Sequence, residues 1–355
     1  MILDFSPLSV WDLVLFGVSF GLVWVSIAAL LSWKQLRAVA EQPGVRYAGS
    51  VLIGIVTLLL FLALEDARLR IGLSAASFMV LLIGTFDENK KLSPVHQLVW
   101  QLVIAVIVVL WGWTIQYVSN WSGDGILALD TLAVGPVLLP GALLTVGWLL
   151  LLINSVNWLD GADGVAPGIG VIALLTLGAV SLLPSVQDEQ TLRLSLIAAG
   201  GVLGLLVWNF PPARVYLGTS GSWYLGLLIG LLAIMSGGKI VTTLLVLALP
   251  VIDFGLVVGQ RLLGRRAPWE GDTERHLHHR LLLAGLSPRT VVCVLMGFSA
   301  VLGWLAVVLQ TQHKVLAFGL AAVVLVLLVV RLILQRPHSA PASGRSSAGQ
   351  ADENV

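Results

Sequence analysis

The chain has 355 residues, of which 57% are hydrophobic and 11% carry a charged side chain, and its formal net charge at pH 7 is +1. Soluble domains have about 25% charged residues, so this composition excludes a water-soluble fold and indicates a surface that faces lipid. The small net charge excludes nucleic acid as a partner held by bulk electrostatics. Any anionic ligand must instead be bound by a local group of residues.

Eleven apolar runs follow one another along the chain, and most approach the roughly 20 residues that a helix needs to cross a bilayer. Charged or Pro- and Gly-rich segments separate them. The predicted spans lie at 11–33, 48–64, 71–86, 96–118, 137–153, 165–184, 192–209, 221–236, 240–260, 290–310 and 315–334. The sequence therefore predicts an all-α integral membrane protein with about eleven transmembrane helices in one domain, residues 1–336.

The two ends of the chain and the basic residues predict its orientation. Asp4 and Asp12 precede or begin the first apolar run without a basic residue before it, which predicts a span rather than a cleavable signal peptide. The tail, residues 337–355, is rich in Ser, Ala, Gly and Pro and is predicted to be disordered. With the N-terminus outside, the inner segments hold 15 Lys and Arg residues and the outer ones hold five. Because basic residues are retained in the cytoplasm, we expect a multi-pass plasma-membrane protein with its C-terminus inside.

Acidic and amide side chains collect in two of the loops predicted to face the cytoplasm. The loop after the third span places Asp87 beside Glu88 at a membrane boundary. The loop after the fifth span has interposed glycines and no basic residue, although Lys or Arg is typical of an inner loop. Its polar residues are Asn154, Asn157, Asp160 and Asp163. This set points to a bound cation or a hydroxyl-rich ligand.

Candidate anion-binding groups lie in two further inner loops. The loop from Pro211 to Ser222 contains Arg214 and a turn of small residues around Thr219, and free N–H groups at such a helix start can bind phosphate. The largest inner loop, 261–289, carries donors suited to a diphosphate. They are His276, His278, His279 and Arg280. A further carboxylate, Asp253 in the ninth span, is expected to face the protein interior, where it can find a partner.

Each feature also has a structural explanation. Asp87 and Glu88 can form local ion pairs with Lys90 and Lys91, and the His residues can form a structural metal site or a solvated amphipathic stretch. A transporter is a third class, but it would place ionisable residues within several spans. Apart from Asp253 the spans are almost free of such residues, so the clustering at one interface favours chemistry there.

The motifs and their order resemble glycosyltransferase family 4, the polyprenyl-phosphate N-acetylhexosamine-1-phosphate transferases. The resemblance runs from about Pro43 to Ser287. Its most specific pieces are Asn157-x-x-Asp160-Gly161-x-Asp163-Gly164 and His276-x-His278-His279-Arg280. Supporting pieces are Pro43 to Gly49, Asp87-Glu88 before Leu-Ser-Pro, and Phe210 to Gly218. The count of eleven helices resembles the sugar-transferase branch of this family more than its ten-helix peptidoglycan branch.

The resemblance implies an enzyme that transfers N-acetylhexosamine-1-phosphate, in particular GlcNAc-1-phosphate, from a UDP-sugar to undecaprenyl phosphate and releases UMP. This would be the first membrane step of cell-envelope polysaccharide synthesis. The implied catalytic residues are Asp87, Glu88 and Asp160. The implied substrate-binding residues are Arg46, Asn154, Asn157, Arg214, His276, His278, His279 and Arg280. The implied cofactor is magnesium (Mg2+), with Mn2+ as the alternative ion, bound by Asp87 and Asp163.

Two departures from the family pattern leave alternatives open. Thr219 stands where the family has an Asp that binds magnesium, and a hydroxyl is a weaker ligand than a carboxylate. Glu88 replaces the second Asp of a pair. An alternative to the enzyme is therefore a catalytically impaired relative that binds lipid phosphate or nucleotide sugar as a scaffold or regulator. Direct transfer and a two-step route through an aspartyl intermediate both remain open, as do a monomer and a homodimer.

Overall fold

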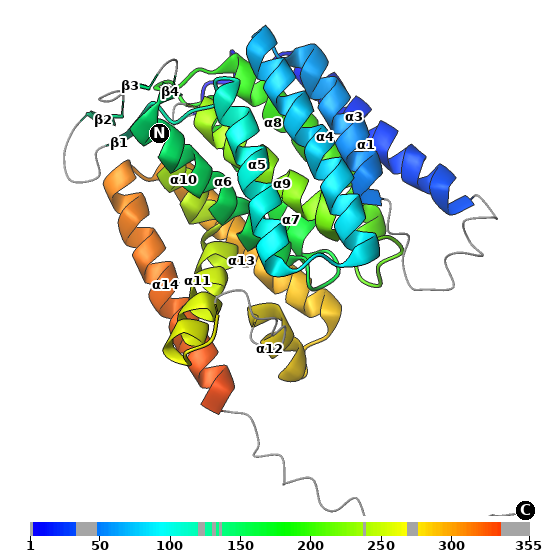
Figure 1. Ribbon diagram of the computed structural model, residues 1–355, viewed down its shortest axis with the longest axis vertical. Coiled ribbons are helices and arrows are strands. Elements are labelled where there is room, and N and C mark those ends of the chain that lie inside the picture. Colours follow the sequence, from blue (N-terminus) through cyan, green and yellow to red (C-terminus); the bar gives the residue numbers. More distant parts are fainter. Residues whose placement is uncertain are drawn as a thin grey trace, which may run out of the picture.

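The computed structural model of this chain describes residues 3–32, 48–119, 125–129, 133–134, 137–236, 239–267 and 276–334. Within these ranges the fold is almost entirely helical (Figure 1). The helices are α1 (Val10–Ser32), α3 (Ala48–Ala63), α4 (Ala67–Lys90), α5 (Pro94–Leu110), α6 (Leu139–Leu159), α7 (Val165–Ser181), α8 (Glu189–Asn209), α9 (Gly218–Met235), α10 (Ile240–Val246), α11 (Ala248–Leu263), α12 (Leu277–Leu283), α13 (Pro288–Val308) and α14 (Thr311–Leu334). Between α5 and α6, β1 (Tyr117–Ser119) pairs antiparallel with β2 (Ile126–Ala128), and β3 (Ala133–Val134) pairs with β4 (Val137–Leu138).

Each of the eleven predicted apolar runs contains a helix, but not every one of these helices is long enough to cross a membrane. Seven helices of the described part are long and apolar enough to cross a membrane, namely α1, α4, α6, α8, α9, α13 and α14. Three shorter apolar helices, α3, α5 and α7, match the remaining unbroken runs, and α10 with α11 forms a broken span. The protein is therefore an all-α integral membrane protein. Arg46, the Pro43 motif and the predicted tail lie outside the described residues.

The broken span has a local cause. The axes of α10 and α11 meet at 81°. Pro250 lacks the N–H that would bond to the carbonyl of Val246, and its ring clashes with that carbonyl, so a straight helix cannot pass this point. The hydroxyl of Ser299 in α13 donates to the Val246 carbonyl at 2.9 Å instead. A backbone group freed inside the membrane is thus satisfied by a neighbouring helix.

The helix α9 forms the centre of the bundle. It contacts α3, α4, α6, α7 and α8, and Trp223 and Tyr224 in its middle are fully buried. The Tyr224 hydroxyl lies 2.8 Å from the hydroxyl of Thr57 in α3. By contrast, α1 and α14 lie at opposite edges of the bundle, where most of their side chains face outward (Figure 1). One end of the central helix therefore offers a position that several surrounding helices can reach.

Candidate active site

The carboxylates of Asp87 and Glu88 are in the last turns of α4. The prediction that they lie in a loop is wrong, because α4 continues to Lys90 and ends where Lys91 takes a left-handed conformation with φ of 50°. Asp87 is 6% exposed, and its Oδ1 accepts hydrogen bonds from the Leu92 N–H and the Gln97 side chain, both at 2.9 Å. The helix therefore fixes the direction of both carboxylates.

Both carboxylates point at the first residues of α9. The hydroxyl of Thr219 donates to Asp87 Oδ2 at 2.8 Å. The backbone N–H and the hydroxyl of Ser220 donate to Glu88 Oε1 at 2.9 and 2.8 Å. The turn before them needs Gly218, because this residue has φ of 73° and a Cβ there would lie 2.4 Å from Glu88 Oε1. The donors of the turn that was predicted to bind phosphate are therefore bonded to the carboxylates of Asp87 and Glu88.

The close approach of α4 and α9 depends on Gly84. A Cβ at this position would lie 2.4 Å from the Cα of Ser220. We expect Gly84→Ala to push the helices apart and to lengthen the hydrogen bonds from Thr219 and Ser220 to the carboxylates. Overpacking of this kind should lower the free energy of unfolding by about 2 kcal/mol and the thermal unfolding midpoint by several degrees. Scanning fluorimetry in detergent measures the midpoint. Gly54→Ala is the control, since no atom lies within 4 Å of a Cβ there; equal midpoints for the two variants would contradict the packing argument.

The Asn and Asp residues of the second motif approach the same turn from α6. Asn154 and Asn157 lie in the last two turns of this helix rather than in the predicted loop. The Ser222 hydroxyl of α9 donates to Asn157 Oδ1 at 2.9 Å. Asn154 donates to Gln101 Oε1 of α5 at 2.6 Å. Asn157 is thus directed at α9, and Asn154 at α5.

Asp160 follows α6 and lies among other acidic groups. Burial raises the pKa of its carboxyl well above the ordinary value, and the charges of Glu88 and Asp163 raise it further. The backbone N–H of Gly218 donates a hydrogen bond to the Asp160 carboxylate, and this bond lowers the pKa of Asp160. Residues far apart in the sequence, Glu88, Asp160 and Asp163, therefore form one acidic region beside the start of α9.

The loop between α8 and α9 is held in place by Asp163 and Asn209. The Ala213 N–H donates to Asp163 Oδ2 at 3.0 Å. Asn209 accepts from the Gly164 N–H and donates to the Val215 carbonyl, both at 2.8 Å. Arg214 of the same loop lies over the Trp208 ring, with Cζ 5.7 Å from its centroid, and forms no salt bridge to a carboxylate of the described chain. The predicted role of Arg214 as an anion contact therefore gains no support from this arrangement.

The predicted His array begins with a buried hydrogen bond to Asp253. His276 Nδ1 lies 2.8 Å from Asp253 Oδ2, and the Leu277 N–H donates to Asp253 Oδ1 at 2.9 Å. Asp253 is 6% exposed, so the prediction that it faces the protein interior is confirmed. Its partner is a histidine and a backbone N–H rather than an arginine. Trp158 of α6 packs its ring edge-on to His276, with centroids 5.3 Å apart.

The remaining members of the array lie in the short helix α12. His278 and His279 have ring centroids 4.3 Å apart, and Arg280 is 7% exposed. A Cβ at Gly161 would lie 2.5 Å from Nε2 of His278 and 3.3 Å from Nε2 of His279. The glycine that follows Asp160 therefore brings the acidic region and the His array into contact, as the two most specific motifs predict.

His278 is neutral in the folded protein. It is 1% exposed, and neither ring nitrogen hydrogen-bonds to another described residue. Burial, and after it the charges of His279 and His276, lower the pKa of His278 to about 3. A buried N–H without a partner costs about 1–3 kcal/mol, and the described chain supplies no partner for this ring.

The lowered pKa of His278 predicts a pH dependence of stability. The unfolded chain takes up a proton on this residue below about pH 6.5, whereas the folded protein resists protonation down to about pH 3, so stability is lost as pH falls through this window. At pH 5 the loss is about 2 kcal/mol. We expect His278→Gln to remove this part of the fall in unfolding midpoint between pH 8 and pH 5. The control is His313→Gln, at an exposed residue of α14. Its unfolding midpoint should fall between pH 8 and pH 5 by as much as that of the unmodified protein.

Several polar partners in the site carry no motif of their own. Gln97 and Gln101 hold Asp87 and Asn154, and Ser220 and Ser222 hold Glu88 and Asn157. The signal for the glutamines was their spacing of four residues, which places both on one face of an otherwise apolar helix. An amide within a predicted span marks a functional or buried polar position.

The acidic region is a candidate site for a divalent cation. Across the described stretches, no three His, Cys, Asp or Glu residues are close enough together to form a metal site on their own. Glu88 and Asp163 both oppose a negative charge on Asp160, and carboxylate oxygens are ligands of the kind that Mg2+ takes beside water or substrate phosphate. The chemistry of these side chains suits the ion, but the described residues do not complete a site for it by themselves.

Known membrane transferases are similar in sequence to this chain. The sequence description of Glycosyl transferase family 4 matches residues 70–237, which include the acidic residues and the start of α9. A Streptomyces coelicolor protein named as a glycosyltransferase is 30% identical over 344 residues, 90% of this chain and 79% of that protein. A Bacillus subtilis protein named as an undecaprenyl-phosphate N-acetylglucosaminyl 1-phosphate transferase is 28% identical over 268 residues, 74% of this chain and 72% of the relative. The decaprenyl-phosphate N-acetylglucosaminephosphotransferase of Mycolicibacterium smegmatis is 26% identical over 358 residues, 89% and 86% of the two chains.

The helical membrane fold and the acidic and His groups at one end of its central helix define a membrane-embedded transferase. The chain belongs to glycosyl transferase family 4.

Proposed function

We propose that this enzyme transfers an N-acetylhexosamine-1-phosphate, with GlcNAc-1-phosphate as the expected group, from a UDP-sugar to undecaprenyl phosphate. The observation that carries the proposal is the convergence of two motifs: the Asp160–Gly161 turn abuts His278 and His279 on one side and the Glu88–Gly218 contact on the other. The relatives named as undecaprenyl- and decaprenyl-phosphate transferases of N-acetylglucosamine phosphate support this substrate pair.

The reaction exchanges one phosphoanhydride bond for another. An oxygen of the lipid phosphate bonds to the phosphorus that carries the sugar, the bond between this phosphorus and the bridging oxygen breaks, and UMP leaves with the bridging oxygen. Charge accumulates on the phosphate oxygens, so catalysis depends on positioning and on electrostatic stabilisation. Magnesium, held by Asp87 and Asp163 together with substrate phosphate, would supply most of this neutralisation.

The His array and α12 would bind the diphosphate of the donor. His278 is neutral and unpartnered in the described chain, so its N–H can donate without competition from a protein acceptor. His276 is a positioning residue, because its Nδ1 is engaged by Asp253 and its ring packs on Trp158. Arg280 supplies a positive charge beside His279. Asn157, oriented by Ser222, would bind the nucleotide sugar.

We propose further that this end of the bundle faces the cytoplasm, with the N-terminus outside. The excess of basic residues in the segments on this side supports the assignment, and nucleotide sugars are cytoplasmic donors. Cysteine-accessibility labelling of intact cells at Ser287, in the loop after α12, and at Glu65, between α3 and α4, tests it. A membrane-impermeant reagent should label position 65 and leave position 287 unmodified; the reverse pattern would overturn the orientation.

The function is tested with purified full-length protein, UDP-GlcNAc, undecaprenyl phosphate and magnesium. We expect release of UMP together with a lipid-linked GlcNAc diphosphate, loss of both products in EDTA, and their return when magnesium is added back. A panel of other UDP-N-acetylhexosamines identifies the preferred donor. Failure of every donor to release UMP, in a preparation that remains folded, would contradict the proposal.

A further inference from the structure

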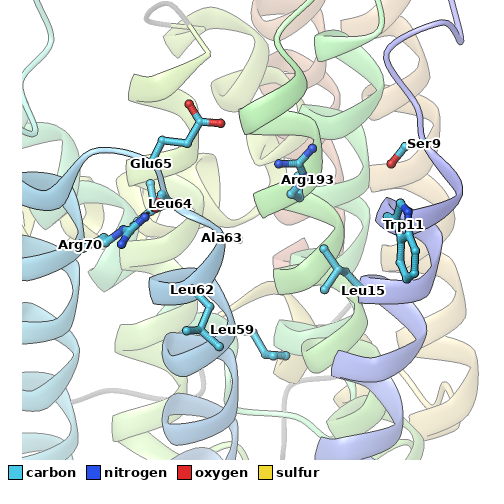
Figure 2. Close-up of a pocket in the computed structure, with 10 residues that line it drawn as sticks. All are labelled: Ser9, Trp11, Leu15, Leu59, Leu62, Ala63, Leu64, Glu65, Arg70 and Arg193. Atoms are coloured by element: carbon cyan, nitrogen blue, oxygen red, sulfur yellow. Dashed lines mark hydrogen bonds between the residues drawn. The ribbon is translucent and has the colours of Figure 1, made fainter.

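A hollow lies at the end of the bundle opposite the candidate active site. The helices α3, α4 and α8 each reach the active site with one end, and their other ends, together with the start of α1, surround a space of about 630 Å3. This volume falls in the range of small-molecule sites, about 300–1,000 Å3. The lining residues are Ser9, Trp11, Leu15, Leu59, Leu62, Ala63, Leu64, Glu65, Arg70 and Arg193 (Figure 2).

The hollow has an apolar wall and a charged rim. In Figure 2, Leu15, Leu59 and Leu62 lie along the helices, whereas Glu65 and Arg193 stand at the open end. Trp11 and Leu62 are 74% and 66% exposed, so the apolar wall continues outward onto a surface that faces lipid. A ligand that fills this space must therefore be an amphiphile, with its polar part at the rim.

The rim holds cationic donors that the protein itself only partly uses. Arg193 bonds through Nε to Asp12 Oδ1 at 2.9 Å, and Asp12 is fixed by the backbone N–H and hydroxyl of Ser9. This pair holds the guanidinium in position, while its two terminal nitrogens form no hydrogen bond within the described chain. Arg70 bonds through Nε to the Leu64 carbonyl and lies over the Phe61 ring at 5.8 Å. These terminal N–H groups suit a phosphate.

The rim also holds one free carboxylate. Glu65 is exposed and lies across the opening from Arg193 (Figure 2), and no salt bridge joins it to Arg70 or Arg193 within the described chain. Since Asp12 already balances Arg193, the rim presents one remaining positive charge, on Arg70, and one negative charge, on Glu65. A purely anionic headgroup would meet repulsion at Glu65, whereas a headgroup that carries both a phosphate and a primary ammonium complements both signs.

We propose that this hollow is a binding site for a phospholipid with a phosphate and an ammonium in its headgroup, phosphatidylethanolamine. The phosphate lies at Arg70 and Arg193, the ammonium at Glu65, and one acyl chain follows Leu59, Leu62 and Leu15. The bound lipid joins the start of α1 to the link between α3 and α4. The site is independent of the transfer reaction at the other end of the bundle.

Native mass spectrometry of the purified full-length protein tests the proposal. The protein is incubated with an equimolar mixture of phosphatidylethanolamine and phosphatidylglycerol that have the same acyl chains. We expect the first bound lipid to be phosphatidylethanolamine with a preference of about fivefold, as is typical of one interfacial ion pair. Equal binding of the two lipids would overturn the proposal.

Two variants localise the preference. Glu65→Gln should bring the ratio to about one, and the matched control Glu189→Gln, at an exposed carboxylate of the same end of the bundle outside the hollow, should keep it. The double variant Asp12→Asn/Arg193→Gln removes the buried pair without leaving a lone charge, and should weaken the first binding step for both lipids. An unchanged ratio in Glu65→Gln would assign the preference to another surface and overturn the proposed site.

Discussion

Replacing Asp160 by Asn is expected to reduce the rate of UMP release by about 10²- to 10³-fold while the protein remains folded. Asp160 lies where the charges of Glu88 and Asp163 converge, and burial and these charges raise the pKa of its carboxyl. In the proposed mechanism Asp160 is one of the catalytic carboxylates that line the site of magnesium and the nucleotide sugar, so its removal should slow the transfer. It also relieves the repulsion among the carboxylates.

Loss of the carboxylate should lower the activity and should not lower the stability, and the two quantities can be measured separately. Initial rates of UMP release give the loss of activity, and the unfolding midpoint in EDTA gives stability, which should equal or exceed that of the unmodified protein. Glu189→Gln, far from the site, should change neither quantity. Activity of Asp160→Asn within threefold of the unmodified enzyme would show that the carboxylate takes no part in the reaction.

Replacing Thr219 by Asp should make the stability of the protein depend more strongly on magnesium. The Thr219 hydroxyl donates to Asp87 at 2.8 Å, so an Asp there exchanges a donor for a third carboxylate beside Asp87 and Glu88. Like charges at this distance repel, and the loss should lower the unfolding midpoint in EDTA by about 5 °C. Magnesium should restore the midpoint by bridging the carboxylates.

The control for this experiment is Thr219→Asn, which has nearly the same shape as the Asp variant and no charge. Its midpoint should rise with magnesium no more than that of the unmodified protein. If magnesium raises the midpoint of Thr219→Asp no more than that of Thr219→Asn, position 219 does not reach the ion, and the proposed cofactor site beside α9 is wrong. A magnesium response that accompanies a higher transfer rate would show that the Thr of the unmodified enzyme limits metal binding.

The membrane fold could be predicted because each span depends on its own sequence. An apolar run of sufficient length forms a helix in lipid whatever surrounds it, since no other structure satisfies its backbone. The ends of the helices could not be predicted in this way. Asp87 and Asn157 are polar, and polarity indicates where a chain leaves the lipid, but α4 and α6 continue as helices past that boundary.

The candidate site was predicted as a set of motifs and not as a geometry. Asp160 and the His array could be expected to meet from the resemblance to a family, and Gly161 shows how closely they do. The serines that hold Glu88 and Asn157 could not be predicted, because small hydroxyl residues are common in membrane helices and have no distinctive spacing. The contact of Arg214 with the Trp208 ring could not be predicted either, and the role of Arg214 as an anion contact stays a prediction.

The bond between Asp253 and His276 also separates the position of the His array from the length of the chain that leads to it. The chain leaves α11 at Leu263 and returns at His276 to a carboxylate of the same helix, so both ends of the intervening segment are fixed to one element. We expect the positions of His278 and His279 to be set by this anchor on α11, so that changes of length between the two ends leave the array in place.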